Sequence, residues 1–321
     1  MKFENIVKEI LKHSTIALFS HQKSDGDAIG SCIALKLALE KVGKKVEIFI
    51  QKPIHRNFEF LGAKKYIDNG GSKKFDLAIS LDCPNSKRMG IYEKKFLSIK
   101  NSIAIDHHAD FENFANLNYA DSSSSSTCLI IYQLLLSMQI EIDSQIALCL
   151  YAGMATDTGR FNHGNMNSEL FMAVAQLYKT GFDFELANYT LFKRQSKNEF
   201  ELYKTALNKL KLFENDKIGI IMLVKEDFEK TGTTPLDTFR IIDTITSIET
   251  IKLACVISQD DEKEFLVSIR SRENYNAQNV AKEFGGGGHI KASGCKILEN
   301  QDVAFSQLLK TCKKEIKRVE N

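Results

Sequence analysis

Short apolar segments alternate with segments of helical periodicity through the first half of this 321-residue chain. Four segments have the composition of buried strands: residues 15–20, 45–50, 76–81 and 102–105. Residues 28–42 carry the apolar spacing of a helix that stops at Gly43. Because parallel strands need a crossover connection, usually a helix, this order predicts an α/β fold with a largely parallel sheet covered by helices.

The rest of the sequence predicts a connector and a second domain. Three helices are predicted next, at residues 123–138, 144–157 and 168–180. Residues 184–213 are helical in pattern and polar on one side, so we interpret them as a connector. Strand patterns return at residues 219–224, 251–258 and 265–270, followed by helices at residues 277–284 and 303–319. We predict a first domain over residues 1–185, a helical linker over 186–213 and a smaller α/β domain over 214–321.

Charge and cysteine content exclude several classes of protein. A net charge of +2 gives no support for binding of long nucleic acids through bulk electrostatics, so any phosphate-binding charge must be local. The seven cysteines include no CxxC pair, as expected of reduced thiols. The first ten residues lack the apolar core of a signal peptide, and no apolar segment approaches the roughly 20 residues that span a bilayer. We therefore expect a cytoplasmic protein with no membrane association.

Histidine and aspartate side chains follow three of the four predicted strands. His21 comes after the first strand, Asp82 after the third, and Asp106-His107-His108 after the fourth. In a parallel α/β sheet, ligands bind beyond the carboxyl ends of the strands, so these side chains should meet at one edge. Asp82 by itself also fits a turn or helix cap. An acid and two adjacent imidazoles after a buried strand rarely serve packing.

Three further aspartates have the positions of ligands. Asp25 and Asp27 flank Gly26, and in a tight loop their carboxylates could reach different metals, although a turn that caps the next helix explains them as well. Asp157 lies at the end of an apolar helical segment. The helix dipole disfavours an acid there, and a bound cation would compensate.

The residue types in these clusters indicate two metal ions and phosphoester chemistry. Histidine and carboxylate ligands without thiolates suit Mn²⁺, Mg²⁺, Zn²⁺ or Fe²⁺. The acids and imidazoles are too many for one ion, whereas two ions about 3.5–4 Å apart would use them all. Such a pair activates a water molecule and neutralises charge on a phosphoryl group. The candidate ligands are therefore His21, Asp25, Asp27, Asp82, the Asp106-His107-His108 cluster and Asp157.

A second cluster is predicted to bind phosphate. Gly286, Gly287 and Gly288 belong to a run of four glycines that ends at His289. Consecutive glycines allow positive φ and close approach of backbone N–H groups to an anion, although a plain loop is the alternative. Arg270 and Arg272, at the end of a predicted hairpin strand, could supply bidentate phosphate contacts or simply form a solvated strand end.

Taken together, these motifs resemble the DHH phosphoesterase superfamily with its DHH-associated C-terminal domain. The matching segments occur in family order and cover most of the chain: His21-x-x-x-Asp25-Gly26-Asp27, Leu81-Asp82, Asp106-His107-His108, Thr156-Asp157-Thr158-Gly159, and Gly286-Gly287-Gly288-His289 with Ala292-Ser293-Gly294. Within the superfamily, the length and the segments DGDAIGS, TDTGRF, SIRS and GGGGH are most similar to the group of bifunctional oligoribonucleases and pAp phosphatases.

The resemblance implies a role for each matching position. One Mn²⁺ would bind His21, Asp25 and Asp82, and the other would bind Asp27, Asp82, His107 and Asp157, which makes Asp82 the bridge. The catalytic set would be Asp82, His108 at the scissile phosphate, and Asp106 as the residue that orients a histidine. Arg270, the glycine run and His289 would hold substrate phosphate in a cleft between the domains.

The same resemblance implies a Mn²⁺-dependent hydrolase of short RNAs that also removes the 3′-phosphate of pAp. Residues 239–245 match the family pattern only loosely, so substrate preference stays open. The alternatives are a phosphodiesterase of cyclic dinucleotides or of linear products such as pApA, a RecJ-like single-strand exonuclease, and a metal-free nucleotide-binding regulator. The glycine–histidine motif counts against an inorganic pyrophosphatase. Homodimerisation is left open.

Overall fold

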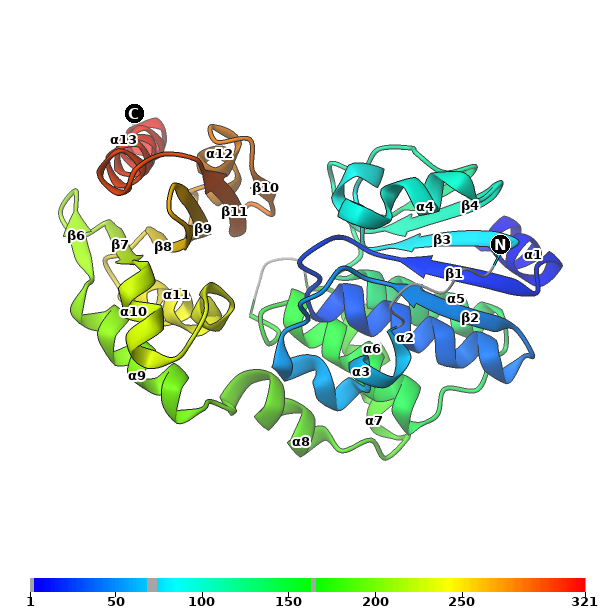
Figure 1. The fold of residues 1–321 in the computed structure, drawn as a ribbon. Coiled ribbons are helices and arrows are strands. Elements are labelled where there is room, and N and C mark those ends of the chain that lie inside the picture. The colour runs from blue at the N-terminus through cyan, green and yellow to red at the C-terminus, as the bar shows by residue number, and fades with distance from the viewer. Residues whose placement is uncertain (1–2, 68–73, 163–165, 321) are drawn as a thin grey trace. The chain divides into compact units, whose positions relative to one another are not determined.

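The computed structural model describes residues 3–67, 74–162 and 166–320, and the chain divides into two compact units, Met1–Arg194 and Gln195–Asn321 (Figure 1). The first unit contains a five-stranded sheet in which every neighbouring pair is parallel. Its order is β2 (Lys45–Phe49), β1 (Thr15–Phe19), β3 (Leu77–Leu81), β4 (Asn101–Asp106) and β5 (Leu117–Ala120). The predicted parallel α/β fold is confirmed, and β5 is a strand that the sequence did not indicate.

Both faces of this sheet are buried, which explains why its strands are continuously apolar rather than alternating. In β1, Ile16 and Leu18 point into one core while Ala17 and Phe19 point into the other. Figure 1 shows three helices under the first face: α2 (Gly26–Lys41), α5 (Thr127–Ser137) and α6 (Ser144–Asp157). The second face is covered by α4 (Glu93–Ser98) and the 3₁₀ segment Ser86–Tyr92, through buried Phe96 and Met89.

Shorter helices complete the first unit. They are α1 (Glu4–Lys12), the 3₁₀ segment Arg56–Leu61, α3 (Ala63–Tyr66), α7 (Ser168–Tyr178), α8 (Phe184–Asn188) and a π-helical turn at Tyr189–Lys193. The last of these lies in the segment that the sequence suggested to be one helical connector. Residues 184–193 and 197–208 are helical, as the sequence indicates, but they form separate helices, and Lys211–Phe213 is a strand instead. A strand of three residues is too short to show a period of two.

The second unit contains a mixed sheet of six strands. Its order is β10 (Gly287–Gly288), β11 (Ala292–Ile297), β9 (Glu264–Ser271), β8 (Leu253–Asp261), β7 (Ile218–Leu223) and β6 (Lys211–Phe213). Only the β7–β8 pair among these is parallel. The predicted hairpin between β8 and β9 is present, with a register shift between Gln259 and Asp261. Strands β6, β10 and β11 were not predicted.

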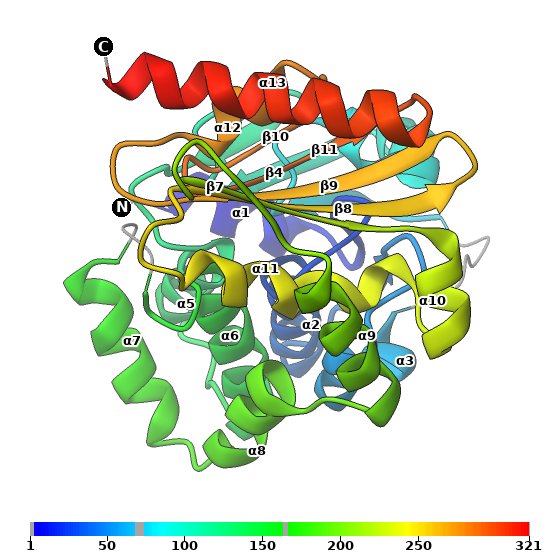
Figure 2. The same cartoon turned by 90° about the vertical axis from the view of Figure 1, so that its left-hand side faces the viewer.

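Helices cover both faces of the second sheet as well (Figure 2). On one face α12 (Ala277–Lys282) and α13 (Gln301–Glu320) pack on Cys255 and Ile257 of β8. On the other face α9 (Lys197–Asn208), α10 (Lys225–Thr231) and α11 (Phe239–Thr246) pack on Ala254 and Val256, with the 3₁₀ segment Pro235–Thr238 beside them. Each unit therefore has its own hydrophobic cores.

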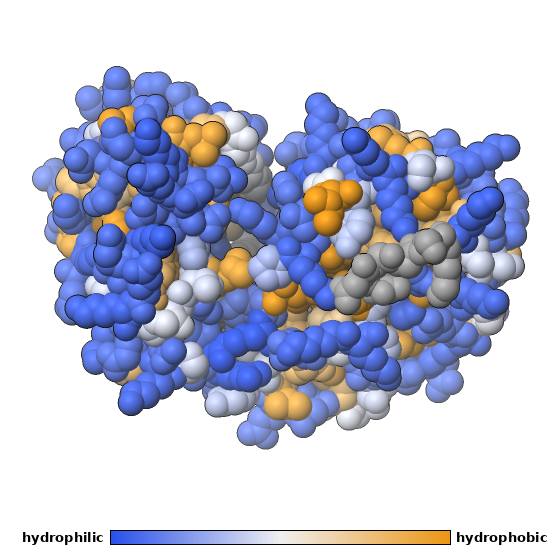
Figure 3. All heavy atoms as spheres, viewed as in Figure 1, coloured by the Kyte–Doolittle hydropathy of each residue, from blue (hydrophilic) through white to orange (hydrophobic). Residues whose placement is uncertain are grey.

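The surface is mostly polar. On the face shown in Figure 3, apolar residues form small separate patches among hydrophilic ones. This pattern follows from the amphipathic sequences of the outer helices, which keep one polar stripe toward solvent. Among the helices of the described residues, none has the length and apolar character that crossing a bilayer requires.

Candidate metal centre

The predicted ligands meet at one edge of the first sheet because three neighbouring parallel strands end there. His21 lies two residues beyond β1, Asp82 directly follows β3, and Asp106 is the last residue of β4. Asp82 has a φ of +53°, a left-handed backbone conformation that non-glycine residues seldom adopt and that is often found at functional sites. The side chains of His21, Asp82, Asp106 and His107 are nearly or fully buried.

Two helices bring the other predicted ligands to this edge. Asp25 is the N-cap of α2, where its Oδ1 accepts hydrogen bonds from the backbone N–H groups of Asp27 and Ala28. The cap interpretation of Asp25 is therefore correct, and it leaves the second carboxylate oxygen available for a ligand role. Asp157 is the last residue of α6.

Glycines allow α2 and α6 to pack closely enough for Asp27 and Asp157 to share a site. A Cβ atom on Gly30 would lie 2.4 Å from the carbonyl oxygen of Cys149. A Cβ atom on Gly153 would lie 2.8 Å from Oδ1 of Asp27 and 2.2 Å from Sγ of Cys128. Neither position has room for a larger residue unless the two helices separate.

The first group of ligand atoms consists of His21, Asp25 and Asp82, which lie within 4.8 Å of one another. Nε2 of His21 is 3.6 Å from Oδ2 of Asp82 and 3.9 Å from Oδ1 of Asp25. Nδ1 of His21 donates to the carbonyl oxygen of Gln22 at 2.8 Å. This contact places the ring proton on Nδ1 and leaves the Nε2 lone pair directed at the two carboxylates, as in metal-binding histidines.

The second group centres on Nε2 of His107. This atom lies 3.8 Å from Oδ2 of Asp27, 3.6 Å from Oδ1 of Asp82 and 3.5 Å from Oδ2 of Asp157. Nδ1 of His107 lies 3.3 Å from the carbonyl oxygen of Ser124, which favours the same tautomer as in His21. The two oxygens of Asp82 thus face different groups, Oδ1 toward His107 and Oδ2 toward His21.

The adjacent pair Asp106 and His108 completes the cluster. Oδ1 of Asp106 accepts hydrogen bonds from both the backbone N–H and Nδ1 of His108, each at 2.7 Å. Burial alone would lower the pKa of His108. The hydrogen bond to Asp106 and the charges of Asp82 and Asp106 outweigh burial and raise the pKa of His108 to about 10. The imidazole is therefore held in one orientation as a proton donor.

The carboxylates of the site repel one another. Burial, together with the charges of Asp82 and Asp157, raises the pKa of Asp27 well above its usual range. Burial and the charges of Asp25 and Asp82 do the same to the pKa of Asp157. Burial also opposes ionisation of Asp82, but its contacts with His21, His108 and His107 keep the pKa of that carboxyl below its usual range. Divalent cations would offset this repulsion, so the residues present fit a metal centre.

The sequence reasoning missed the residues that hold these ligands in place. Backbone N–H groups of Thr127 and Cys128, at the start of α5, donate to Oδ2 and Oδ1 of Asp27 at 2.7 and 2.8 Å. The hydroxyl of Thr127 donates to Oδ1 of Asp82 at 3.2 Å. Ser126, directly before Thr127, caps α5 through its side chain. Nothing in the local sequence indicates that this helix start contacts an acid 100 positions earlier.

The predicted arginines lie near the end of β9 in the second unit. Arg270 is on the sheet face that carries α11, where its Nε lies 4.0 Å from Oδ1 of Asp243 and its side chain is 29% exposed. Arg272 follows the strand, and its Nη1 donates to the carbonyl oxygen of Ile248. One donor of each guanidinium is occupied by the backbone, since Nη1 of Arg270 donates to the carbonyl oxygen of Ile269 at 3.2 Å.

The glycine run forms a β-hairpin rather than an open loop. Gly287 and Gly288 pair with Gly294 and Ser293, and His289 occupies the turn, where its N–H donates to the carbonyl oxygen of Ala292. The N–H of Gly286 donates to the carbonyl oxygen of Ala281, so it is not available to an anion. A Cβ atom on Gly286 would lie 2.3 Å from the carbonyl oxygen of Gly294, whereas Gly287 has open space around it. The backbone needs glycine at 286 for packing, and phosphate binding by this segment stays a prediction.

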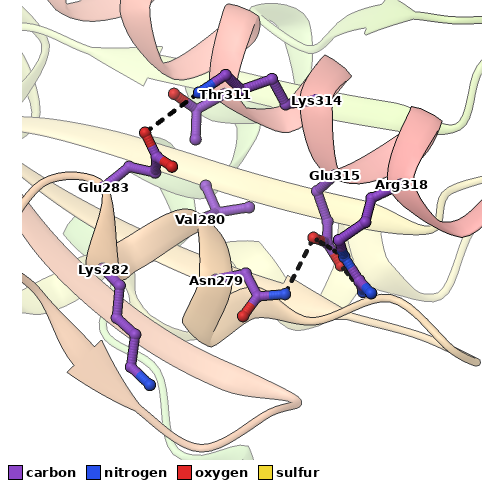
Figure 4. Close-up of a pocket in the computed structure, with 8 residues that line it drawn as sticks. All are labelled: Asn279, Val280, Lys282, Glu283, Thr311, Lys314, Glu315 and Arg318. Atoms are coloured by element: carbon purple, nitrogen blue, oxygen red, sulfur yellow. Dashed lines mark hydrogen bonds and ion pairs between the residues drawn. The ribbon is translucent and has the colours of Figure 1, made fainter.

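A groove of about 670 Å³ lies elsewhere on the second unit, between α12 and α13 (Figure 4). Four of its charged side chains form two ion pairs: Lys314 lies 3.4 Å from Glu283, and Arg318 lies 2.7 Å from Glu315. Asn279 donates to the same Glu315 carboxylate. The groove contains none of the predicted site residues, and its polar groups serve the packing of the two helices.

Comparison with known families gives two matches along the chain. A model described as the DHH family, N-terminal domain, matches residues 15–154, and a model described as the DHHA1 domain matches residues 215–318. The first span contains all but one of the predicted metal ligands, since Asp157 lies just beyond it. The second span contains Arg270, the glycine run and His289.

Individual proteins are similar over nearly the whole length. A probable bifunctional oligoribonuclease and PAP phosphatase NrnA of Streptococcus mutans is 28% identical, over 94% of this chain and 96% of that protein. An uncharacterized protein, the MG371 homolog of Mycoplasma pneumoniae, is 30% identical over 90% of this chain and 88% of its own length. The crystal structure of an exopolyphosphatase-related protein from Bacteroides fragilis matches with a TM-score of 0.91 and 24% identity, over 100% of this chain and 98% of that one.

Proposed function

The chain belongs to the DHH family and is a hydrolase of phosphoester bonds, and from this premise we propose that it hydrolyses short oligoribonucleotides to mononucleotides and removes the 3′-phosphate of pAp. One observation carries the proposal. The carboxylates of buried Asp27 and Asp82 and of partly buried Asp157 each place an oxygen 3.5–3.8 Å from Nε2 of His107, and divalent cations would offset the repulsion between them. A site with imidazole and carboxylate ligands at strand ends can hold the metal ions that promote phosphoester hydrolysis.

We propose Mn²⁺ as the native metal, because mixed imidazole and carboxylate ligands suit it and the set contains no thiolate. His21, Asp25 and Asp82 would hold one ion, and Asp27, Asp82, His107 and Asp157 would hold the other. When bound, two ions supply an activated water nucleophile and neutralise charge on the phosphoryl group.

Residues of the chain itself are proposed to contact the substrate. His108 is held by Asp106 through Nδ1, so its ring has a fixed orientation from which it can donate a proton to a phosphate oxygen as negative charge develops there. Arg270 and the segment around His289 are proposed to bind a substrate phosphate, and an active site between the two domains stays a prediction. Arg270 suits this role because its guanidinium is partly buried and can bind phosphate through two donors.

Short substrates fit the charge of the protein. A net charge of +2 provides little of the long-range attraction that proteins use to hold long single strands. The name of the similar S. mutans protein includes both an oligoribonuclease and a PAP phosphatase activity, which supports the same pair of substrates here. A RecJ-like exonuclease would be expected to carry a basic groove along the bound strand.

The test is a substrate panel with purified protein and Mn²⁺. Di- to pentaribonucleotides, of which pApA is one, and pAp are expected to release mononucleotide and phosphate faster than cyclic di-AMP reacts. If neither the short RNAs nor pAp react, the proposed substrates are wrong. Faster turnover of cyclic di-AMP, or turnover of pApA without turnover of pAp, would favour the alternative phosphodiesterase. Protein that binds nucleotide but takes up no Mn²⁺ would indicate a regulator instead.

Asp82→Ala should remove activity on every substrate of the panel, because both ligand groups use this carboxylate. We expect kcat/KM to fall by about 10³-fold or more, since electrostatic stabilisation is usually the largest single contribution to catalysis. Asp260→Ala, which removes an exposed acid near the end of β8, serves as the control and should react like the wild type.

A further inference from the structure

The start of α5 contacts two carboxylates that come from different parts of the first sheet. The backbone N–H groups of Thr127 and Cys128 bind one oxygen each of Asp27, so both oxygens of that side chain are fixed by protein donors. The hydroxyl of Thr127 reaches Oδ1 of Asp82 at 3.2 Å. Thr127 is fully buried. Among the residues in these contacts, it alone touches both aspartates.

The hydrogen bond from the Thr127 hydroxyl restricts how the Asp82 carboxylate can rotate. A carboxylate can only accept, so the hydroxyl donates its proton to Oδ1 of Asp82. This contact selects one rotation of a terminal torsion that is otherwise broad and roughly two-fold. In the selected rotation Oδ1 lies 3.6 Å from Nε2 of His107 while Oδ2 lies 3.6 Å from Nε2 of His21. The two oxygens are therefore divided between the two groups of ligand atoms.

We propose that Thr127 is a positioning residue of the metal centre, whose hydroxyl orients the Asp82 carboxylate so that one oxygen serves each ligand group. The inference rests on the proposed function, because it assumes that both groups bind metal. Thr127 acts through Asp82 and is not itself a catalytic residue. Partners of this kind around metal ligands typically contribute a factor of about 10–100 to metal affinity.

The alternative role for Thr127 is simple packing of its methyl group in the buried space at the start of α5. Two pairs of variants separate this role from orientation of Asp82. Thr127→Val keeps the shape and loses the hydroxyl, whereas Thr127→Ser keeps the hydroxyl and loses the methyl group. Thr127→Ala differs from Thr127→Ser by the hydroxyl alone, which preserves the comparison if the valine variant does not fold.

The measurement is Mn²⁺ binding to metal-stripped full-length protein by isothermal titration calorimetry. Thr127→Val and Thr127→Ala are expected to bind Mn²⁺ about 10- to 100-fold more weakly, and Thr127→Ser to stay within about threefold of the wild type. Ser126→Ala is the matched control. It removes the side-chain cap of α5 without removing a contact to Asp27 or Asp82, so it should lower the melting temperature and leave the affinity within about threefold.

Unchanged Mn²⁺ affinity in Thr127→Val would overturn the inference while leaving the proposed function intact. Equal weakening in Thr127→Ser and Thr127→Ala would also overturn it, since the methyl group would then be the part that matters. A wild-type protein that binds no Mn²⁺, with or without turnover of short RNA, would instead remove the two-metal premise itself.

Discussion

Asp27 shows most clearly how single residues of this site combine structure and chemistry. Its carboxylate accepts hydrogen bonds from two amides of α5, and its pKa is nevertheless raised by burial and by the carboxylates of Asp82 and Asp157. The amides thus position the group without removing the repulsion between acids. A site that keeps this repulsion is less stable without cations and binds them more strongly when they are present.

Gly153→Ala tests whether the position of Asp27 sets metal affinity. A new Cβ would lie 2.8 Å from Oδ1 of Asp27 and 2.2 Å from Sγ of Cys128. Alanine gains up to about 1 kcal/mol of helix propensity, but overpacking of this kind costs about 1–3 kcal/mol, so the net effect should be destabilising. We expect urea unfolding to show lower stability and calorimetry to show weaker Mn²⁺ binding.

Gly219→Ala is the control for Gly153→Ala. Its Cβ would meet Cδ1 of Ile251, the far end of a flexible side chain in the second unit, so any loss of stability should leave Mn²⁺ affinity unchanged. If Gly153→Ala binds Mn²⁺ as tightly as the wild type, the carboxylate tolerates displacement and its fixed position is not required.

At the scale of elements, pairs of helices fix the geometry of each unit. In the first unit α2 and α6 approach closely at Gly30 and Gly153. In the second unit α12 and α13 are joined by Glu315, a buried acid whose carboxylate accepts from Asn279, the backbone of Asn276 and Arg318. Burial alone would raise the pKa of Glu315, but these hydrogen bonds, with that of Arg318 the strongest, keep it below its usual range.

The depressed pKa of Glu315 predicts a pH-dependent contribution to stability. The folded state binds the Glu315 proton more weakly than the unfolded state, so the stabilisation is complete above the unfolded pKa of about 4.3 and is lost as the pH falls through the folded value. Glu315→Gln should lower the free energy of unfolding by about 1–3 kcal/mol at pH 7. The difference from wild type should shrink progressively below about pH 4.3.

Urea unfolding at a series of pH values measures this difference between wild type and Glu315→Gln. Glu299→Gln, at an exposed position, is the control and should differ little from wild type at any pH. A difference for Glu315→Gln that stays constant from pH 7 to below pH 4 would contradict the assignment of the effect to the Glu315 charge.

At the scale of the whole molecule, the chain consists of two units with separate hydrophobic cores. The predicted metal ligands all belong to the first unit. Arg270, Arg272, the glycine run and His289 belong to the second. The predicted metal ligands and the predicted substrate-binding residues thus lie in different units.

Removal of metal should therefore destabilise the first unit and not the second. A ligand present at 100 times its Kd stabilises the folded state by about 2.7 kcal/mol, and chelation removes this contribution. Differential scanning calorimetry with Mn²⁺ and with a chelator should show a lower melting temperature for the first-unit transition alone. Leu308→Ala, in the core of the second unit, identifies the second-unit transition. It should lower the free energy of unfolding of that unit by about 2–5 kcal/mol and leave the first-unit transition unchanged.

A downward shift of both transitions by the same amount on chelation would show that metal binding is not confined to the first unit. The same result would weaken the division of roles between the two units. No change in either transition would mean that the metal centre contributes nothing to stability.

Much of the fold and most of the centre could be predicted from local sequence. Strand 15–20 and helix 144–157 have strong periodic or apolar patterns, and each appears within a residue of its predicted bounds. His21, Asp82 and His107 could be grouped because parallel strands end at one edge. Strands β5, β6 and β10 could not be predicted, since segments of two to four residues carry no measurable period.

The sequence by itself determined that this chain forms a parallel sheet with acids and imidazoles at its carboxyl edge, because both properties follow from the order of residues along the chain. Only the tertiary structure decided which groups hold those acids. The amides of Thr127 and Cys128 reach Asp27, and the Thr127 hydroxyl reaches Asp82, through contacts between segments 45–101 positions apart. The tertiary structure also decided that Gly286 and Gly288 allow the close packing of a hairpin. Such contacts depend on how helices and strands pack in three dimensions, and no local pattern records that packing.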